Sequence, residues 1–526
     1  MGLGVREAVV TFGLTKVLPI QTGALIAIFS RLVMVFSELL FALLLLVLVK
    51  VFREQTKRMI GFILKFKHEI VLGVLTLTYT TYFTIATFLK HDNFYTGRFD
   101  LGNMDQTIWN TIHGRIFQLT DPNGVENISR LAFHSDFILI LLSPLYIIWE
   151  SPKMLLLTQT LILAMGGIFV YLIAQKVLKN KLIALTFAFA FYINPSVNFM
   201  NLFDFHSVTL ATTFFLGAFY FLIQKKYFPM VIFLILGGIT KEQVWAITGL
   251  FGLYLIFAHK QKALGLSIFS ISFLIFYFLI WHAIPQALGD RHFAIQYYSD
   301  FGASPGEIVR NIITSPVQTI NTLFQTEQID YLRKLFIPLG YLSFLSPQIL
   351  VFAIPDLLIN LLSQNKQMHE IYYQYSATIT PFLFISAIFA VRAINKKLPI
   401  VGKESLAIAV LLLSLFAQDS FGPLPFTNKP QDEMFKKGRE NREIIKERIS
   451  QIPIESSVTA SNNLGAHLSQ RQNIYTIPNG IGEADYVLIY LSEDEKTKQS
   501  FKKTAEDHRY VLIFSDKTFY EFKKIF

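Results

Sequence analysis

Long apolar runs, interrupted by short polar clusters, are the dominant pattern along this chain. A helix needs about 20 apolar residues to cross the hydrocarbon core of a membrane, and runs such as 155–174 and 263–284 reach that length. The run 137–149 would give roughly 20 Å of helix, which is too short to cross and predicts an interfacial or re-entrant piece. The pattern therefore predicts a polytopic α-helical membrane protein with about 8–12 membrane segments, several of them short or re-entrant.

The positions of Lys and Arg predict the orientation of these segments. Basic loops lie on the cytoplasmic side of a membrane, and five short loops qualify: 53–68, 175–181, 224–227, 259–262 and 392–397. Counting crossings from them places a large first loop, 90–134, on the outer side. A second loop, 285–334, and the last hundred or so residues are outside by the same count. Residues 17–52 stay open between one long crossing and two short ones.

The pattern changes near residue 428, where the long apolar runs end. Short strand-like runs then alternate with helical ones, which predicts a small α/β module. We thus expect an N-terminal membrane part with a basic cytoplasmic loop (1–68), a transmembrane core (69–427) and an extracytoplasmic α/β domain (428–526). The module has no glycine-rich phosphate loop, and we favour a structural or docking role for it over substrate binding.

Composition supports the membrane interpretation and narrows the partners. The chain is 52% hydrophobic and 16% charged, whereas soluble proteins carry about 25% charged residues. A net charge of +10 would suggest nucleic acid in a soluble protein, but much of the excess lies in loops beside apolar segments. We therefore expect the lipid bilayer, and no nucleic acid, as a partner. The absence of cysteine excludes disulfides, thiolate nucleophiles and cysteine-based metal sites.

Four polar clusters interrupt the apolar pattern: residues 99–110, 133–137, 203–206 and 241–242. An ionisable group in hydrocarbon costs roughly 2.5–3.5 kcal/mol on insertion scales, so such groups usually mark function. The predicted topology places all four clusters on the outer side of the membrane. We therefore predict that they form a single site.

The first cluster supplies two candidate catalytic carboxylates, Asp100 and Asp105. If the segment from Asp105 is helical, Trp109 follows on the same face at a spacing of four residues, with Gln106 beside it. Gln106 and Trp109 are then candidates for substrate binding. The alternative is a solvated loop in which Asp105 caps the following helix.

The second and third clusters each hold a histidine and an aspartate two residues apart: His134 with Asp136, and Asp204 with His206. In an extended turn this spacing points both side chains to the same side. Such a pair can orient the histidine, bind a divalent cation or hold a phosphate-bearing ligand through water. The alternative is an interfacial turn whose polar groups face water.

The fourth cluster is a Lys241–Glu242 pair within an apolar run. Lysine binds phosphate as a point charge, and Glu242 is a third catalytic candidate that would position a metal, a base or a hydroxyl. The alternative is an ion pair between the two residues. His369 and Tyr375 precede a later apolar helix and are weaker substrate-binding candidates, because aromatic residues also form belts at membrane interfaces.

Several of these segments together resemble a known family. FDLGNMDQTIWNTIHG (99–114), FHSDF (133–137), NPSVNFMNLFDFH (194–206), the KE pair and ASNNLGAHLSQRQNIY (460–475) are similar to the domain-of-unknown-function-2079 family of predicted prokaryotic membrane proteins. Its layout resembles that of GT-C glycosyltransferases, polytopic enzymes that use polyprenyl-phosphate-linked sugars at the outer membrane face. This resemblance implies an acidic base or metal contact in the first large outer loop. Asp100 matches that position best, and Asp105 next.

Our leading hypothesis is a membrane glycosyltransferase that moves a sugar from a polyprenyl-phosphate-type donor to an unidentified acceptor. Asp100 would deprotonate the acceptor, and the donor phosphate would meet Lys241 together with Arg98 or Arg115. A divalent cation is compatible with the residue types, and the sequence indicates no other cofactor. The alternatives are a transporter or lipid flippase, or a non-catalytic scaffold for assembly of the cell envelope.

Overall fold

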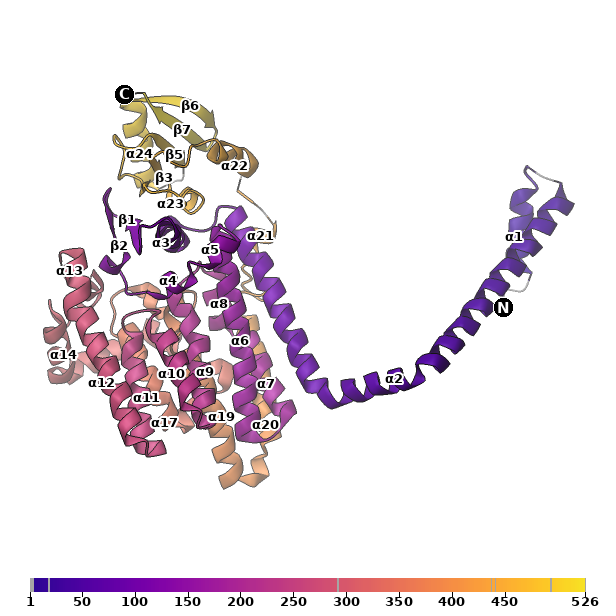
Figure 1. Ribbon diagram of the computed structural model, residues 1–526, viewed down its shortest axis with the longest axis horizontal. Coiled ribbons are helices and arrows are strands. Elements are labelled where there is room, and N and C mark those ends of the chain that lie inside the picture. Colours follow the sequence, from indigo (N-terminus) through magenta and orange to yellow (C-terminus); the bar gives the residue numbers. More distant parts are fainter. Residues whose placement is uncertain are drawn as a thin grey trace. The chain divides into compact units, whose positions relative to one another are not determined.

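The computed structural model describes residues 4–17, 19–290, 293–436, 438–439, 441–491 and 494–525. Its contacts divide the chain into two compact units, Met1–Val71 and Leu72–Phe526. Figure 1 shows that helices dominate and that a small sheet forms near the C-terminus.

The first unit holds α1 (Val5–Leu14) and the first part of α2 (Ile20–Asp92). Within α2, the 28 residues Ile20–Val47 are long and apolar enough to cross a membrane as one helix. Length and composition thus favour one crossing over two for residues 17–52. Phe66 departs from helical backbone angles, so α2 is kinked there.

The second unit contains most of the membrane helices. Helices long and apolar enough to cross are α6 (Pro152–Leu178), α20 (Lys403–Phe421) and the continuous stretch Lys262–Leu288, built from α12 (Lys262–Phe278), η4 (Leu279–Ala283) and α13 (Ile284–Leu288). Two further helices, α7 (Lys181–Tyr192) and α8 (Pro195–Leu202), are bent by 43° relative to each other and form either a broken span or a re-entrant loop. The polytopic helical fold expected from the apolar pattern is therefore confirmed.

The shorter apolar runs form short helices. Residues 137–149 give only α4 (Ile138–Leu142) and α5 (Leu145–Ile148). Proline interrupts the run at 335–362, because it lacks an N–H donor and clashes with the preceding turn. The remaining helices of the core and the second outer loop are α9 (Ala211–Ile223), α10 (Tyr227–Gly238), α11 (Val244–His259), α14 (Pro305–Thr314), α15 (Pro316–Leu323), α16 (Thr326–Phe336), α17 (Pro347–Leu350), α18 (Ile354–Leu361) and α19 (Thr380–Lys397).

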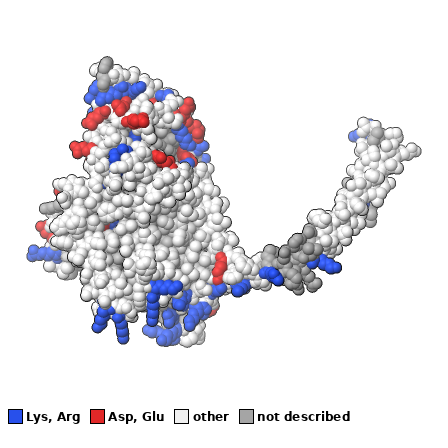
Figure 2. Space-filling model, in the orientation of Figure 1, with Lys and Arg blue, Asp and Glu red and all other residues white. Residues whose placement is uncertain are grey.

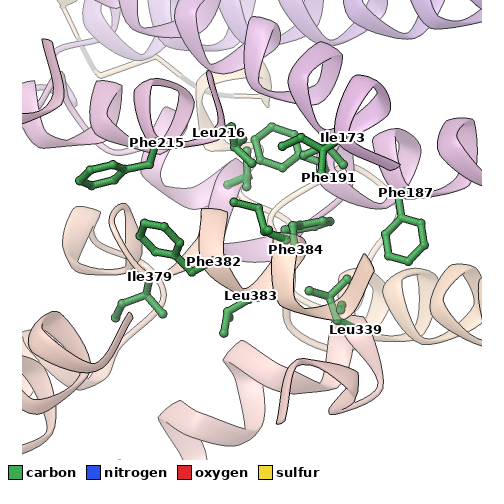
Figure 3. Packing of buried hydrophobic residues seen from close by; sticks show 14 of the residues in the cluster. Ile173, Phe187, Phe191, Phe215, Leu216, Leu339, Ile379, Phe382, Leu383 and Phe384 are labelled. Carbon is green, nitrogen blue, oxygen red and sulfur yellow. The ribbon is translucent and has the colours of Figure 1, made fainter. Parts of the chain in front are cut away.

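Aromatic and branched side chains fill the space between α6, α7, α9 and α19. Figure 3 shows part of this cluster, whose labelled members are Ile173, Phe187, Phe191, Phe215, Leu216, Leu339, Ile379, Phe382, Leu383 and Phe384. Elsewhere, α11 and α12 approach closely at two glycines. A Cβ on Gly252 would lie 2.5 Å from the carbonyl oxygen of Gly265, so neither helix tolerates a side chain there.

The C-terminal segment folds into the predicted α/β module. Its five-stranded sheet has the order β4-β3-β5-β7-β6, with β4, β3 and β5 parallel and the last two strands antiparallel. Every strand predicted in this module is present. The elements are α21 (Glu433–Lys436), α22 (Arg442–Ser450), β3 (Val458–Ala460), α23 (Asn462–Gly465), β4 (Ile474–Thr476), β5 (Tyr486–Tyr490), α24 (Glu495–Glu506), β6 (Tyr510–Asp516) and β7 (Phe519–Lys524).

This module packs directly on the loop 90–134, which we call the first outer loop after its predicted side of the membrane. That loop contains the π-helix η1 (Arg98–Gly102), α3 (Asn103–Ile112) and the hairpin β1 (Gln118–Thr120) and β2 (Asn127–Ser129). Phe94 belongs to the hydrophobic core of the module, and His91 stacks on His467 with ring centres 4.0 Å apart. These contacts explain why residues 428–525 group with the transmembrane core in one unit.

Charge is unevenly distributed over this unit. Figure 2 shows Lys and Arg gathered, on the face in view, at the end where α6 and α7 are joined. A broad band with few charged side chains follows, and the C-terminal module carries both signs. A band poor in charge between two charged ends is the surface expected of a protein that spans a bilayer.

Candidate functional site

Asp100 and His206 form a pair that joins the first and third polar clusters. Asp100 lies in η1, and His206 follows α8 in an extended conformation. The Nε2 atom of His206 lies 3.1 Å from Oδ1 of Asp100, and its Nδ1 atom lies 3.2 Å from the carbonyl oxygen of Asp204. Both ring nitrogens thus face oxygen atoms, and each can donate a hydrogen bond when it carries a proton.

Asp204 anchors the start of the first outer loop to the end of α8. Its Oδ2 atom accepts a hydrogen bond of 2.7 Å from the Gly97 N–H, and Nζ of Lys90 lies 3.5 Å from its Oδ1 atom. Burial raises the pKa of Asp204 and the negative charge of Asp100 raises it further, whereas Lys90 lowers it. Asp204 thus holds the backbone that presents Asp100.

Asp100 opens onto a cavity. Its side chain is 35% exposed, and the cavity beside it has a volume of about 430 Å³. Small-molecule sites have volumes of about 300–1,000 Å³, so this one has room for a sugar. The wall combines residues of the membrane core, the first outer loop and the C-terminal segment, among them Lys90, Phe203, Tyr372, Arg439, Asn462 and Asn463.

The second and fourth clusters also meet. Nδ1 of His134 lies 2.9 Å from Oε1 of Glu242, and the Ser135 N–H donates to Oε2 over 3.1 Å. Burial lowers the pKa of His134 to about 4, despite the opposing charge of Glu242, so the ring is neutral at pH 7. The Lys241–Glu242 ion pair is not formed, and in the described parts of the chain no carboxylate forms an ion pair with the half-buried Lys241.

Asp136 has a partner that the sequence did not indicate. The Arg130 guanidinium donates hydrogen bonds to both oxygens of Asp136, from Nε to Oδ1 at 3.0 Å and from Nη2 to Oδ2 at 2.9 Å. Both side chains are buried. The alternative of a turn whose polar groups face water is therefore wrong for Asp136. The Ser207 hydroxyl also donates to Asp136 over 3.3 Å. Because Ser207 directly follows the third cluster, this bond links the Asp100–His206 pair to the His134–Glu242 pair through the chain. No hydrogen bond between described residues joins Asp100 directly to Glu242.

Asp105 has a different environment from Asp100. It lies inside α3, which begins at Asn103, so it does not cap that helix. Its buried carboxylate accepts hydrogen bonds from the hydroxyls of Tyr146 and Ser469, both at 2.6 Å, and from Nε2 of Gln470 at 3.1 Å. Burial raises the pKa of Asp105 to about 6. The side chain therefore joins the outer loop to the C-terminal module.

Gln106, Trp109 and Arg98 are likewise engaged inside the protein. Nε2 of Gln106 donates to the carbonyl oxygen of Arg471 over 3.0 Å, and its Oε1 accepts from Nη2 of Arg98 over 2.7 Å. The Trp109 indole donates to Glu150 over 2.7 Å. Arg98 has no exposed surface, so our expectation that it meets a donor phosphate is wrong for this conformation. Arg115, the other candidate, lies over the Trp109 ring.

The two weaker candidates both contact Asn360. Nε2 of His369 lies 2.9 Å from the carbonyl oxygen of Asn360, and the ring is buried. Nδ2 of Asn360 donates to the carbonyl oxygen of Tyr375 over 3.0 Å, and burial raises the pKa of the Tyr375 hydroxyl. As for metals, no three His, Asp or Glu side chains gather as ligands within the described ranges.

Comparison with known families identifies the chain. The model of a family described as a predicted membrane protein, domain of unknown function 2079, matches residues 90–515. The chain belongs to this family. The family resemblance drawn from the sequence motifs is thereby confirmed. No curated protein matches the chain.

Solved structures identify the fold of this family member. The crystal structure of ArnT from Cupriavidus metallidurans bound to undecaprenyl phosphate matches with a TM-score of 0.54 and 10% identity, over 88% of this chain and 98% of that one. The Archaeoglobus fulgidus oligosaccharyltransferase in complex with zinc and sulfate matches with a TM-score of 0.38 and 14% identity, over 72% of this chain and 58% of that one. The likeness to ArnT confirms the GT-C-like layout at the level of the fold.

Proposed function

We propose that this protein is a membrane glycosyltransferase that moves a sugar from a polyprenyl-phosphate-type donor to an acceptor at the outer membrane face. The observation that carries this proposal is the Asp100–His206 pair at a sugar-sized cavity. The fold likeness to ArnT, whose structure contains undecaprenyl phosphate, supports a lipid-linked donor.

In the proposed reaction an acceptor hydroxyl attacks the anomeric carbon of the donor sugar. A new C–O bond forms, the bond from that carbon to the phosphate oxygen breaks, and polyprenyl phosphate leaves with the bonding electrons. Asp100 takes the proton of the attacking hydroxyl. A general base of this kind contributes typically about 10²–10⁴-fold to the rate.

His206 and Asp204 are positioning residues in this proposal. His206 fixes one carboxylate oxygen of Asp100, so the other stays available to the acceptor. Asp204 holds Gly97, three residues before Asp100, in place. Lys241 carries a half-buried ammonium without an ion-pair partner among the described residues, which suits it to the departing phosphate.

The proposed orientation follows from the charges. The end of the helical unit rich in Lys and Arg, visible in Figure 2, lies in the cytoplasm under the positive-inside rule. The opposite end, with the cavity and the C-terminal module, is then extracytoplasmic. Cysteine labelling would test this, because the chain has no native cysteine. A Lys498→Cys variant in intact cells should react with a membrane-impermeant maleimide, and a Lys226→Cys variant should not.

Donor cleavage by purified protein tests the proposed chemistry. Proteoliposomes are supplied with undecaprenyl-phosphate sugars that carry a radiolabelled hexose or pentose, and release of label is measured with and without candidate acceptors. We expect release from at least one donor, and its loss with Asp100→Asn. Cleavage that Asp100→Asn leaves intact would remove Asp100 as the base. Movement of intact donor across the bilayer without cleavage would favour a flippase.

A further inference from the structure

The C-terminal segment closes one side of the Asp100 cavity. Arg439, which follows α21, and the pair Asn462–Asn463, which begins α23, line it together with the membrane core. The two asparagines belong to ASNNLGAHLSQ (460–470), a segment that resembles the family but has no role in the transfer step proposed above.

The asparagine pair reaches the catalytic loop closely. Oδ1 of Asn462 accepts a hydrogen bond of 3.1 Å from the Phe99 N–H, next to Asp100. The approach is tight at Gly97, since a Cβ there would lie 3.0 Å from Nδ2 of Asn462. Nδ2 of Asn463 is buried and has no hydrogen-bond partner among the described residues. A buried amide N–H without an acceptor is unfavourable, so a ligand hydroxyl that accepts from it would remove the penalty.

Arg439 presents a fixed positive charge to the same cavity. Its Nε atom donates to the carbonyl oxygen of Phe94 over 3.1 Å. The guanidinium also lies over the rings of Tyr490 and Tyr95, at 4.9 and 5.3 Å from their centres. In the part of the chain that the structure describes, no carboxylate forms an ion pair with Arg439. A planar guanidinium held in this way suits a carboxylate or phosphate, which it binds with two parallel hydrogen bonds.

We propose that Arg439, Asn462 and Asn463 form the acceptor subsite and that the acceptor is an anionic sugar. The amides would bind ring hydroxyls, the guanidinium would bind a carboxylate or phosphate on the sugar, and Phe203 and Tyr372 would offer aromatic surface to the ring. This assignment rests on the proposed transfer, which places the acceptor hydroxyl at Asp100. It gives the C-terminal module a substrate-binding role in addition to docking.

A binding experiment tests this subsite without requiring turnover. Saturation-transfer NMR on the full chain in detergent micelles compares methyl β-glucoside, methyl β-glucuronide and methyl β-glucoside 6-phosphate. We expect at least a threefold larger signal from one or both acidic probes than from the neutral one, and the preferred acidic probe identifies the acid group. Arg439→Gln should abolish the preference, and Asn463→Ala should lower the signal from all three probes. Lys498→Gln, an equal loss of charge on exposed α24, should leave both the preference and the signals unchanged.

Equal signals from all three probes in the wild type, a preference that survives Arg439→Gln, or unchanged signals in Asn463→Ala would overturn the subsite. Thermal melting of each variant checks its fold. If Arg439→Gln melts at a lower temperature than wild type, Arg439→Lys is tested in its place. Lysine keeps the positive charge but cannot form the two parallel hydrogen bonds of a guanidinium. We expect the preference to fall at least twofold in Arg439→Lys, and an unchanged preference would contradict the guanidinium assignment.

Kinetics separate this inference from the proposed function. With the preferred acidic glycoside as acceptor, Arg439→Gln should raise the acceptor KM at least tenfold, whereas Lys498→Gln should leave it within threefold of wild type. Transfer with an unchanged acceptor KM would remove the subsite and leave the glycosyltransferase standing. Arg439-dependent binding without cleavage of any donor would leave the binding site and remove the transfer reaction.

Discussion

Asp100 and Asp105 lie five residues apart in one helical segment, yet they have opposite environments. Asp100 is 35% exposed, contacts His206 and opens onto a cavity. Asp105 has no exposed surface and accepts three hydrogen bonds, two of them from the C-terminal module. Asp100 lies in the π-helix η1 and Asp105 in α3, and their different partners show that the two carboxylates point to different sides.

The comparison separates a carboxylate that can do chemistry from one that holds the structure together. A base needs access to a proton and one oxygen left for the substrate, and Asp100 has both. Asp105 has its oxygens occupied by protein donors, and burial favours its neutral form. Similar carboxylates in one loop can therefore serve different purposes, and the following variants test that separation.

The largest difference is expected in turnover. Asp100→Asn removes the proposed base and should lower kcat by about 10²–10⁴-fold. The kcat of Asp105→Asn should stay within about threefold of wild type, because the amide can replace the hydrogen bonds of the carboxylate. Its oxygen can accept from Tyr146 and Gln470, and its N–H₂ group can donate to the Ser469 oxygen. The Ser469 hydroxyl can then donate to the carbonyl oxygen of Ala466. Donor cleavage in proteoliposomes measures both. Equal losses would contradict the separation of roles.

Stability should show the reverse order. Asp105→Ala leaves the buried donors of Tyr146, Ser469 and Gln470 without their acceptor, so we expect a loss of about 2–4 kcal/mol in the free energy of unfolding. Asp100→Ala, at a partly exposed position, should cost less than about 1 kcal/mol. Chemical denaturation in detergent, followed by tryptophan fluorescence, compares the two. A larger loss for Asp100→Ala would reverse our assignment.

The pH dependence of stability sharpens the comparison. The folded state raises the pKa of Asp105 from 3.8 to about 6, so its stabilising contribution is complete below pH 3.8 and is lost as the pH rises through 6. The contribution to the free energy of unfolding that is lost over this pH range is about 3 kcal/mol. The Asp105→Asn variant has no titratable group at this position, so its denaturation midpoint should vary less between pH 4 and 6.5 than the midpoint of the wild type. Identical pH profiles for the two proteins would show that Asp105 does not titrate in this window.

The smallest effect is expected at Gly465, where α23 meets the outer loop. A Cβ there would lie 2.5 Å from Cβ of Arg98, so Gly465→Ala forces the module away from η1. We expect a loss of about 1–2 kcal/mol in stability. In Gly465→Ala, the increase in the rate of amide hydrogen exchange over wild type should be larger in α3 and α23, next to Asp105, than in α11. Gly306→Ala, where a Cβ meets open space, is the control. Unchanged exchange in Gly465→Ala would contradict this tight contact.

Local pattern sufficed for the apolar helices and for the strands of the C-terminal module, although not for the β1–β2 hairpin or the helices of the second loop. The apolar runs predicted the spanning and short helices because both depend on length and hydrophobicity. The alternation after residue 428 predicted the strands of the module for the same reason. The positions of the polar clusters between apolar runs also predicted which segments would meet, although not their pairing: 99–110 with 203–206, and 133–137 with 241–242.

The amino-acid pattern was enough to predict a polytopic helical protein with an α/β module and the residue types of a polar site. Three facts came from the folded arrangement alone: which of two similar aspartates is accessible, that Arg130 pairs with Asp136, and that Arg98 is buried. Periodicity records which face of an element is apolar, whereas the environment of Asp105 depends on Ser469 and Gln470, 364 and 365 residues away along the chain. Contacts between such distant residues leave no periodic signal in the sequence.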